Sequence, residues 1–294
     1  MKGTGVAMVA VWMLAVGHWA QAQALPPDVQ SAIDPFKGQI YFSAKNLKTG
    51  ATLRYRADEK ITTASVIKVP ILVELYRQAE EHRLALEDVV AFTEINRVEG
   101  SGILKNLGLG LRLTLRDAAV LMITMSDNSA TNMLIDKVGI AAVNARLRQL
   151  GLRETTLYKK VFKPAPADAP AEQKKFGLGV TTAEEMLLLM EKIYRKEAVE
   201  AAACDDMIAI LKGQLDRDQI PRYLNGPGWE KVQVAHKTGS LDQVRNDVGI
   251  VFTPAGDFIL SLFAQESADR KWTPDNEAAV TLGRLALAIL KQWK

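Results

Sequence analysis

Residues 63–72 read TASVIKVPIL and put a serine, Ser65, three positions before a lysine, Lys68. A serine hydroxyl is a weak nucleophile near neutral pH and needs an adjacent base to take its proton. Side chains three positions apart on a helix lie on one face. Lys68 can therefore accept the proton of Ser65 if its pKa is lowered by burial or by a second cation. This stretch predicts a serine nucleophile with a lysine base.

Two further short motifs follow, Ser126-Asp127-Asn128 and then Lys237-Thr238-Gly239. A Ser-x-x-Lys, a Ser-Asp-Asn and a Lys-Thr-Gly motif together are a signature of enzymes that acylate a serine. Lys237 is also a candidate for the second cation near Lys68. Another Lys-Thr-Gly, at residues 48–50, lies between two apolar runs and before the nucleophile. We interpret that copy as a hairpin turn.

Longer stretches around these motifs closely resemble the class A β-lactamase family: residues 63–72, 100–104 (GSGIL), 121–132 (LMITMSDNSATN) and 236–240 (HKTGS). The likeness runs from about residue 38 to the C-terminus. It implies an α/β (α+β) fold, with an antiparallel sheet flanked by helices and an inserted all-α lobe. We expect an α/β lobe at about residues 25–62 and 205–294, an all-α lobe at about 63–204, and a catalytic cleft between the two lobes.

The N-terminus has the features of a secretory signal peptide. Lys2 is followed by an apolar run at residues 6–16 and by small residues at Ala20, Ala22 and Ala24, so we expect cleavage after Ala22 or Ala24 and a catalytic domain over residues 23–294. The apolar run is too short to span a membrane, and no cysteine lies near the cleavage site to carry a lipid anchor. We expect a monomer secreted to the periplasm or the extracellular space.

Composition argues against several other classes of function. A formal net charge of +3 is too small to suggest nucleic-acid binding. Cys204, the single cysteine, precludes an internal disulfide, and its alanine-rich surroundings predict a packed helical position. His82 and His236 follow no metal-ligand spacing. We therefore expect no metal and no cofactor.

The apolar spacing predicts strands near both ends of the chain and helices between them. We expect strands at residues 39–46 and 51–55 around the turn at 48–50, and again at 232–235, 247–253 and 257–264. Helices are expected at 69–84, 115–125, 130–138 and 183–193, and a closing amphipathic helix at 276–293. Residues 159–179, with three prolines, are expected to form a long irregular loop.

The family resemblance implies a role for each motif residue. Ser65 would attack a β-lactam or acyl-D-alanyl carbonyl, and the N–H groups of Ser65 and Ser240 would form the oxyanion hole. Ser126 would relay a proton to the leaving nitrogen, and Asn128 would bind the side-chain amide of the substrate. The substrate carboxylate would be held by the Lys237-Thr238-Gly239-Ser240 segment, with Arg245 as a helper.

The residues themselves leave other interpretations open. Ser126 and Asn128 could be helix caps, and Arg245 could be part of a surface ion pair. We expect Ser65 to lie at the start of a helix that Thr62 or Thr63 caps. Pro70 would then cost that helix one hydrogen bond, to Val66.

One family residue is missing. Class A enzymes carry a glutamate in an omega-shaped loop, in a Glu-x-x-Leu-Asn pattern, which activates the deacylating water. In this chain that position falls near Val161 or Phe162, and neither side chain is a base. Glu154, Asp168 and Glu172 are possible substitutes, although each could equally be a solvated loop charge.

Three functions are compatible with these motifs. The first is a class A-like β-lactamase that confers antibiotic resistance. The second is a D,D-peptidase or penicillin-binding protein acting on peptidoglycan stem peptides, which the missing glutamate favours. The third is a β-lactam-binding protein without turnover. A Ser-His-Asp esterase is set aside because its Gly-x-Ser-x-Gly motif is absent.

Overall fold

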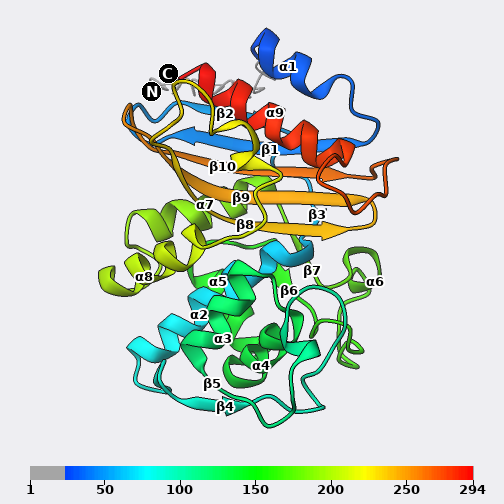
Figure 1. Cartoon of the computed structure of the whole chain (residues 1–294), viewed down its shortest axis with the longest axis vertical. Helices are drawn as coiled ribbons and strands as arrows, with labels where there is room; N and C mark the ends of the chain where they lie inside the picture. Colours follow the sequence, from blue (N-terminus) through cyan, green and yellow to red (C-terminus); the bar gives the residue numbers. More distant parts are fainter. Residues whose placement is uncertain (1–23, 294) are drawn as a thin grey trace, which may run out of the picture.

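The computed structural model describes residues 24–293. Its main sheet is antiparallel, with the strand order β2-β1-β10-β9-β8, so strands from the two ends of the chain lie side by side (Figure 1). β1 pairs with β10 along its whole length, with Ser43 opposite Ser261. The strands are β1 (Gln39–Asn46), β2 (Thr52–Tyr55), β8 (Gln233–Leu241), β9 (Val244–Phe252) and β10 (Phe258–Gln265).

The first Lys-Thr-Gly motif is a hairpin turn, as predicted. The N–H groups of Lys48 and Thr49 donate to Asn46 Oδ1, and Gly50 has φ +77°, a backbone conformation that glycine adopts without strain. This copy of the motif connects β1 to β2 at the edge of the sheet, away from Ser65.

Helices cover both faces of the sheet (Figure 1). On one face, α1 and α9 pack together, and their apolar sides build a core with β1 and β10 that includes Val29, Phe42, Leu262 and Leu282. On the other face, α7 packs against β1, β9 and β10, and α8 packs against β8. These helices are α1 (Pro27–Ile33), α7 (Ala183–Tyr194), α8 (Ala201–Lys212) and α9 (Glu277–Lys291), and a short 3₁₀ helix, η3 (Ile220–Tyr223), packs against α9.

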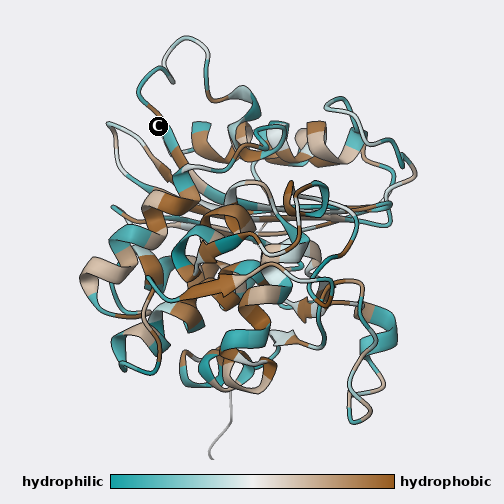
Figure 2. Cartoon of the chain, turned by 60° about the horizontal axis from the view of Figure 1, so that its bottom comes forward, coloured by the Kyte–Doolittle hydropathy of each residue, from teal (hydrophilic) through white to brown (hydrophobic). Residues whose placement is uncertain are grey.

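The remaining helices form a group beyond α7 and α8. α2 lies at its centre, because ten of its side chains are buried and it contacts α3, α4, α5 and α8. Figure 2 shows hydrophobic segments concentrated in the middle of the molecule and hydrophilic ones in the outer loops. The elements are η1 (Ala64–Ile67), α2 (Lys68–Glu80), η2 (Leu104–Asn106), α3 (Leu115–Thr124), α4 (Asn128–Val138), α5 (Ile140–Gln149) and α6 (Gln173–Phe176).

Two small sheets complete the fold. β3 (Ile61–Thr62), β6 (Thr156–Leu157) and β7 (Gly179–Thr181) form one in the order β3-β7-β6, and β4 (Val89–Ala91) pairs with β5 (Arg112–Thr114). The first brings the two ends of the long loop, near residues 157 and 179, next to the strand that precedes Ser65. The expectation of an antiparallel sheet flanked by helices is confirmed.

The start of the helix at Ser65 differs from the prediction. Ser65 lies in the 3₁₀ turn η1, and the α-helix begins at Lys68. Neither helix start has a side-chain cap: Thr63, at the start of η1, donates its Oγ1 to Gly179 O (3.0 Å) instead, and Ile67, at the start of α2, has no polar side chain. Pro70 is therefore the third residue of α2, where the first N–H groups of an α-helix have no partner within the helix anyway. Its missing N–H costs this helix less than we expected.

Cys204 is fully buried on α8, which confirms the packed helical position. Burial raises the pKa of its thiol, against a smaller opposing effect of the Val199 carbonyl, to which the thiol donates. None of the helices in the described range is long and apolar enough to cross a bilayer. The expected signal peptide, residues 1–22, lies outside the described residues.

Candidate active site

The Ser65 turn is held tightly against strand β8. Ala64 has φ +45°, a conformation that is rare and strained for a residue with a side chain. Asn246, on β9, fixes the chain just before it, because its Nδ2 donates to the carbonyls of Thr62 (3.0 Å) and Thr63 (3.1 Å). A Cβ at Gly239 would lie 2.9 Å from Ser65 N. Only glycine lets β8 approach Ser65 this closely.

Lys68 is fully buried and joins the first two motifs. Its Nζ donates to Ser126 O (2.8 Å), Ser126 Oγ (3.0 Å) and Asn128 Oδ1 (2.9 Å). The backbone N–H of Lys68 donates to Ser65 O within the 3₁₀ turn, but within residues 24–293 no hydrogen bond joins Lys68 Nζ to Ser65. Burial lowers the pKa of Lys68 well below its ordinary value, the charge of Lys237 lowers it further, and Asp127 opposes the shift. A lysine with a lowered pKa is more readily the neutral amine that can accept a proton.

The Ser-Asp-Asn motif links two segments through its middle residue. Asp127, rather than Ser126 or Asn128, is the N-cap of α4, and its Oδ1 accepts from Ala130 N (2.9 Å). Its Oδ2 accepts from the N–H groups of Ile103 and Leu104, which fixes the 100–104 loop on this motif. The alternative interpretation of Ser126 and Asn128 as helix caps is therefore wrong. Ser126 has φ +53°, a second strained backbone next to Lys68.

The third motif presents alternate side chains of β8 to the site. Thr238 and Ser240 line a cavity of about 440 Å³ together with Ser65, Ser126 and Arg245, which we call the Arg245 cavity. Lys237 is fully buried and is not among the lining residues. Burial lowers its pKa to about 8, against opposing effects of Asp216 and Asp247.

Arg245 is 5% exposed and forms no ion pair within the described part of the chain, so the surface ion-pair interpretation is wrong. Its guanidinium donates to the carbonyls of Val244 (2.8 Å) and Lys271 (2.7 Å). It also lies 4.8 Å from the ring centroid of Trp272, a cation–π contact. These contacts fix Arg245 at the wall of the cavity, with part of its five N–H donors left for a ligand.

Ser65 also lines a second, larger cavity of about 910 Å³, which we call the Phe162 cavity. Asn128, Val161 and Phe162 line it as well, and Phe162 is 66% exposed. The structure thus brings the two positions expected for the deacylating glutamate into one cavity with Ser65, the predicted nucleophile.

The three acids considered as substitutes do not line either cavity. Glu154 and Glu172 both pair with Lys60, at 2.9 and 3.4 Å, and Glu172 also accepts from Tyr158 Oη (2.6 Å). Asp168 is exposed. These contacts give Glu154 and Glu172 a part in anchoring the loop.

Three contributors to this geometry were not identified from the sequence. Asn132 binds the backbone of Val161, Asn246 fixes the turn before Ser65, and Trp272 stacks on Arg245. Asn132 lies in one of the stretches that resemble the family, but its amide signals neither a nucleophile nor a base. No local pattern marks Asn246 or Trp272.

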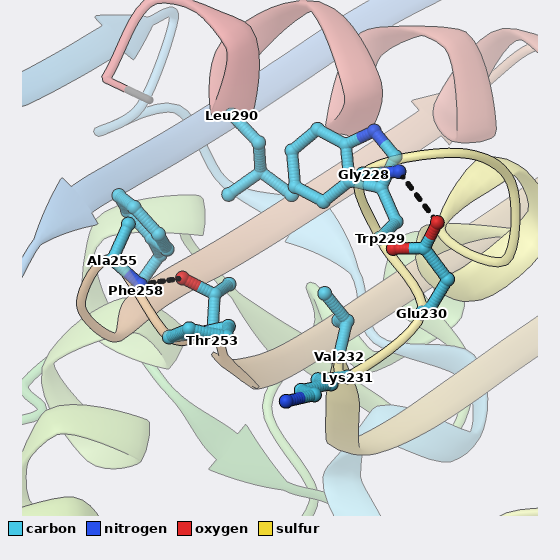
Figure 3. A pocket seen from close by; sticks show the side chains of 10 residues that line it. Gly228, Trp229, Glu230, Lys231, Val232, Thr253, Ala255, Phe258 and Leu290 are labelled. Carbon is cyan, nitrogen blue, oxygen red and sulfur yellow. Dashed lines mark hydrogen bonds between the residues drawn. The ribbon is translucent and has the colours of Figure 1, made fainter.

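Another cavity, of about 370 Å³, lies between the 228–232 loop, the β9–β10 turn and α9 (Figure 3). Trp229, Val232, Phe258 and Leu290 give it an apolar lining. It contains no predicted site residue, whereas Ser65 lines both the Arg245 cavity and the Phe162 cavity.

The chain matches a known family over nearly all of the described residues. The "Beta-lactamase enzyme family" matches residues 24–293, and the chain belongs to this family. A β-lactamase of Bacillus licheniformis is 26% identical over 245 residues, covering 81% of this chain and 74% of that protein. The resemblance and the enzyme class inferred from the three motifs, a serine hydrolase of the β-lactamase type, are confirmed.

Solved structures agree with the fold. A β-lactamase from Sphaerobacter thermophilus DSM 20745 has a TM-score of 0.79 and is 31% identical, covering 90% of this chain and 95% of that one. A variant of PBP-A, solved as an acyl-enzyme complex with penicillin G, has a TM-score of 0.78 at 24% identity and covers 92% and 99% of the two chains.

Proposed function

We propose that this enzyme hydrolyses β-lactams through an acyl-enzyme on Ser65. The observation that carries the proposal is the environment of Lys68, a buried amine of lowered pKa that donates to Ser126 and Asn128 one helical turn from Ser65. Neutral Lys68 accepts the Ser65 proton while Oγ attacks the lactam carbonyl. The C–N bond of the ring then breaks, and Ser126 delivers a proton to the leaving nitrogen and regains one from Lys68.

The other motif residues bind the substrate. The N–H groups of Ser65 and Ser240 stabilise the oxyanion, and Asn128 binds the amide of the substrate side chain. Thr238, Ser240 and Arg245 hold the carboxylate through charge-assisted hydrogen bonds. Gly239 permits the close approach of β8 to Ser65. Lys237 is buried behind the cavity wall and acts on the site through its charge. That charge also keeps the pKa of Lys68 low.

The biological setting follows from the same proposal. The N-terminal sequence supports export to the periplasm or beyond without a membrane anchor, and the enzyme would act there as a monomer. Hydrolysis of β-lactams at that location would give antibiotic resistance.

A second candidate, a D,D-peptidase acting on peptidoglycan stem peptides, is favoured by one observation. Val161 and Phe162 line the cavity that also contains Ser65, and neither side chain carries a carboxylate. A positioned general base contributes roughly 10²- to 10⁴-fold, so its absence would slow deacylation. A stable acyl-enzyme is the behaviour expected of a penicillin-binding protein.

Intact-mass spectrometry after mixing with penicillin G separates the candidates. A β-lactamase shows an adduct that disappears within seconds while penicilloic acid accumulates. A peptidase shows an adduct that persists for many minutes, together with release of D-alanine from an acyl-D-Ala-D-Ala peptide. Ser65→Ala abolishes the adduct in both cases, and an adduct on that variant would assign the nucleophile to another residue.

A further inference from the structure

The Arg245 cavity contains two acidic side chains that the proposed reaction does not use. Asp216 and Asp218 come from the segment between α8 and η3, and both line this cavity with Ser65, Thr238 and Arg245. The N–H of Asp218 donates to Asp216 Oδ1 (3.1 Å), so the two residues form one compact turn. Acids are unexpected where a substrate carboxylate is to bind, because like charges repel.

No salt bridge neutralises either acid within residues 24–293. Asp216 is near enough to Lys237 and Arg245 to oppose the lowering of their pKa values by burial. Burial raises the pKa of Asp218, and Asp216 raises it further, against a smaller effect of Arg222. Arg222 itself pairs with Asp275 (2.9 Å). The cavity thus holds two half-buried carboxylates without a direct cationic partner.

The neighbouring residue adds a third unused acceptor. Gln219 lines the same cavity, is 1% exposed, and its Oε1 has no hydrogen-bond partner among the described residues. A buried acceptor without a donor is costly, and such groups usually have a partner. Asp216, Asp218 and Gln219 together, which we call the acidic end, offer acceptors to a ligand that brings donors or positive charge.

We propose that the acidic end binds a cationic group carried by the substrate beside its carboxylate. The inference rests on the proposed β-lactam function and narrows its substrate class. Thr238, Ser240 and Arg245 hold the carboxylate, and Asp216 and Asp218 hold the cation beyond it. In a cephalosporin, the substituent at C3′ is attached next to the carbon that carries the carboxylate. The favoured substrates are therefore cephalosporins with a cationic C3′ group.

The test uses two cephalosporins with the same thienylacetyl side chain. Cephaloridine carries a pyridinium at C3′, and cephalothin carries a neutral acetoxy group. Second-order rate constants for acylation of the full enzyme are divided by the rate constants for alkaline hydrolysis, which removes the difference in intrinsic reactivity. The corrected ratio of cephaloridine to cephalothin should exceed one and should fall with added salt, because ions screen charge interactions.

Asp216→Asn and Asp218→Asn keep the shape of each side chain and remove its charge. Each should lower the corrected ratio about fivefold, within the range of a partly exposed ion pair. Asp275→Asn is the matched control. It removes one charge from an acid that is 89% exposed and already paired with Arg222, and it should leave the ratio unchanged.

The outcomes separate this inference from the proposed function. If both cephalosporins acylate Ser65 but the ratio is insensitive to salt and to both variants, the acidic end does not select cations. If Asp275→Asn lowers the corrected ratio as much as the other two variants do, only the net charge of the protein matters, which also overturns the inference. If neither compound acylates Ser65, the proposed function itself fails and this inference with it.

Discussion

Asn132 holds the backbone of Val161 from both sides. Asn132 Nδ2 donates to Val161 O (3.0 Å), and Asn132 Oδ1 accepts from Val161 N (2.8 Å). A buried amide that satisfies a donor and an acceptor of one residue fixes that residue more firmly than a single hydrogen bond does. The long loop is therefore anchored at the position where a side chain enters the Phe162 cavity.

This anchor predicts that Val161→Glu accelerates deacylation. Because the backbone is already fixed beside Ser65, a carboxylate at this position can activate water, and a positioned base contributes roughly 10²- to 10⁴-fold. The lifetime of the penicillin adduct, followed by intact mass, should shorten accordingly. In Val161→Gln the new side chain has the shape of glutamate but no carboxylate, so the lifetime should stay unchanged. An equal effect of the two variants would point to loop disturbance rather than catalysis.

A second prediction concerns the contact between β8 and the nucleophile. Gly239→Ala would put a Cβ 2.9 Å from Ser65 N, 3.0 Å from Thr63 O and 3.1 Å from Val66 N. All three are backbone atoms, so the turn itself must move, and the oxyanion hole moves with it. Removing one oxyanion donor costs about 10²- to 10³-fold in rate, and we expect a loss of acylation of that order.

Gly108→Ala is the control for this substitution, because nothing lies within 4 Å of a Cβ at that position. It should acylate at the wild-type rate. Circular dichroism should show the same helical content in both variants. A Gly239→Ala enzyme that acylates normally would mean that the contact does not position Ser65.

The sequence predicted the parts of this protein that local patterns encode. The two apolar runs around the turn at residues 48–50 marked β1 and β2, and the apolar spacing marked α3, α7 and α9 within a few residues. The three motifs singled out Ser65, Lys68 and Lys237, because nucleophile and base chemistry restricts the residue types, and the structure brings the three motifs together; their catalytic roles stay a prediction. The prediction that Thr62 or Thr63 caps an α-helix starting at Ser65 was wrong. Thr63 instead bonds to Gly179, a contact between distant segments that no local pattern contains.

The same reason explains what was missed in the site. Arg245 is buried by Trp272 and by the carbonyl of Lys271, which lie more than twenty residues along the chain. The strain at Ala64 and Ser126 is imposed by tertiary packing, since neither residue type favours a positive φ. Asp216 and Asp218 could be found only once the fold had brought them beside Arg245.

A third prediction concerns the pH dependence of acylation. The rate should rise with pH as Lys68 loses its proton, because only the neutral amine can act as a base. The charge of Lys237 contributes to the lowered pKa of Lys68, after burial. Lys237→Met removes that charge, raises the pKa of Lys68 and should shift the rise to higher pH. The measurement is the acylation rate with penicillin G between pH 5 and 10, with its methyl ester in parallel.

The two substrates distinguish the roles of Lys237. If Lys237 acts only through Lys68, the profiles of acid and ester shift together. If it also attracts the carboxylate, the acid loses additional rate below about pH 8, where Lys237 is charged in the wild-type enzyme. Lys291→Met removes an exposed lysine at the end of α9 and should change neither profile.

The last prediction concerns stability. The pKa of Lys237 is about 8 in the folded protein, lowered by burial from an ordinary value of 10.5, which corresponds to about 3 kcal/mol. Below pH 8 the lysine is charged in both states, and its burial is fully destabilising. Between pH 8 and 10.5 the unfolded chain binds more protons than the folded one, so the free energy of unfolding rises with pH. Lys68 contributes in the same direction.

Urea unfolding at several pH values should show this rise, and Lys237→Met should reduce it, whereas Lys291→Met should not. A rise that is identical in Lys237→Met and wild type would mean that the buried Lys237 ammonium is compensated inside the folded protein.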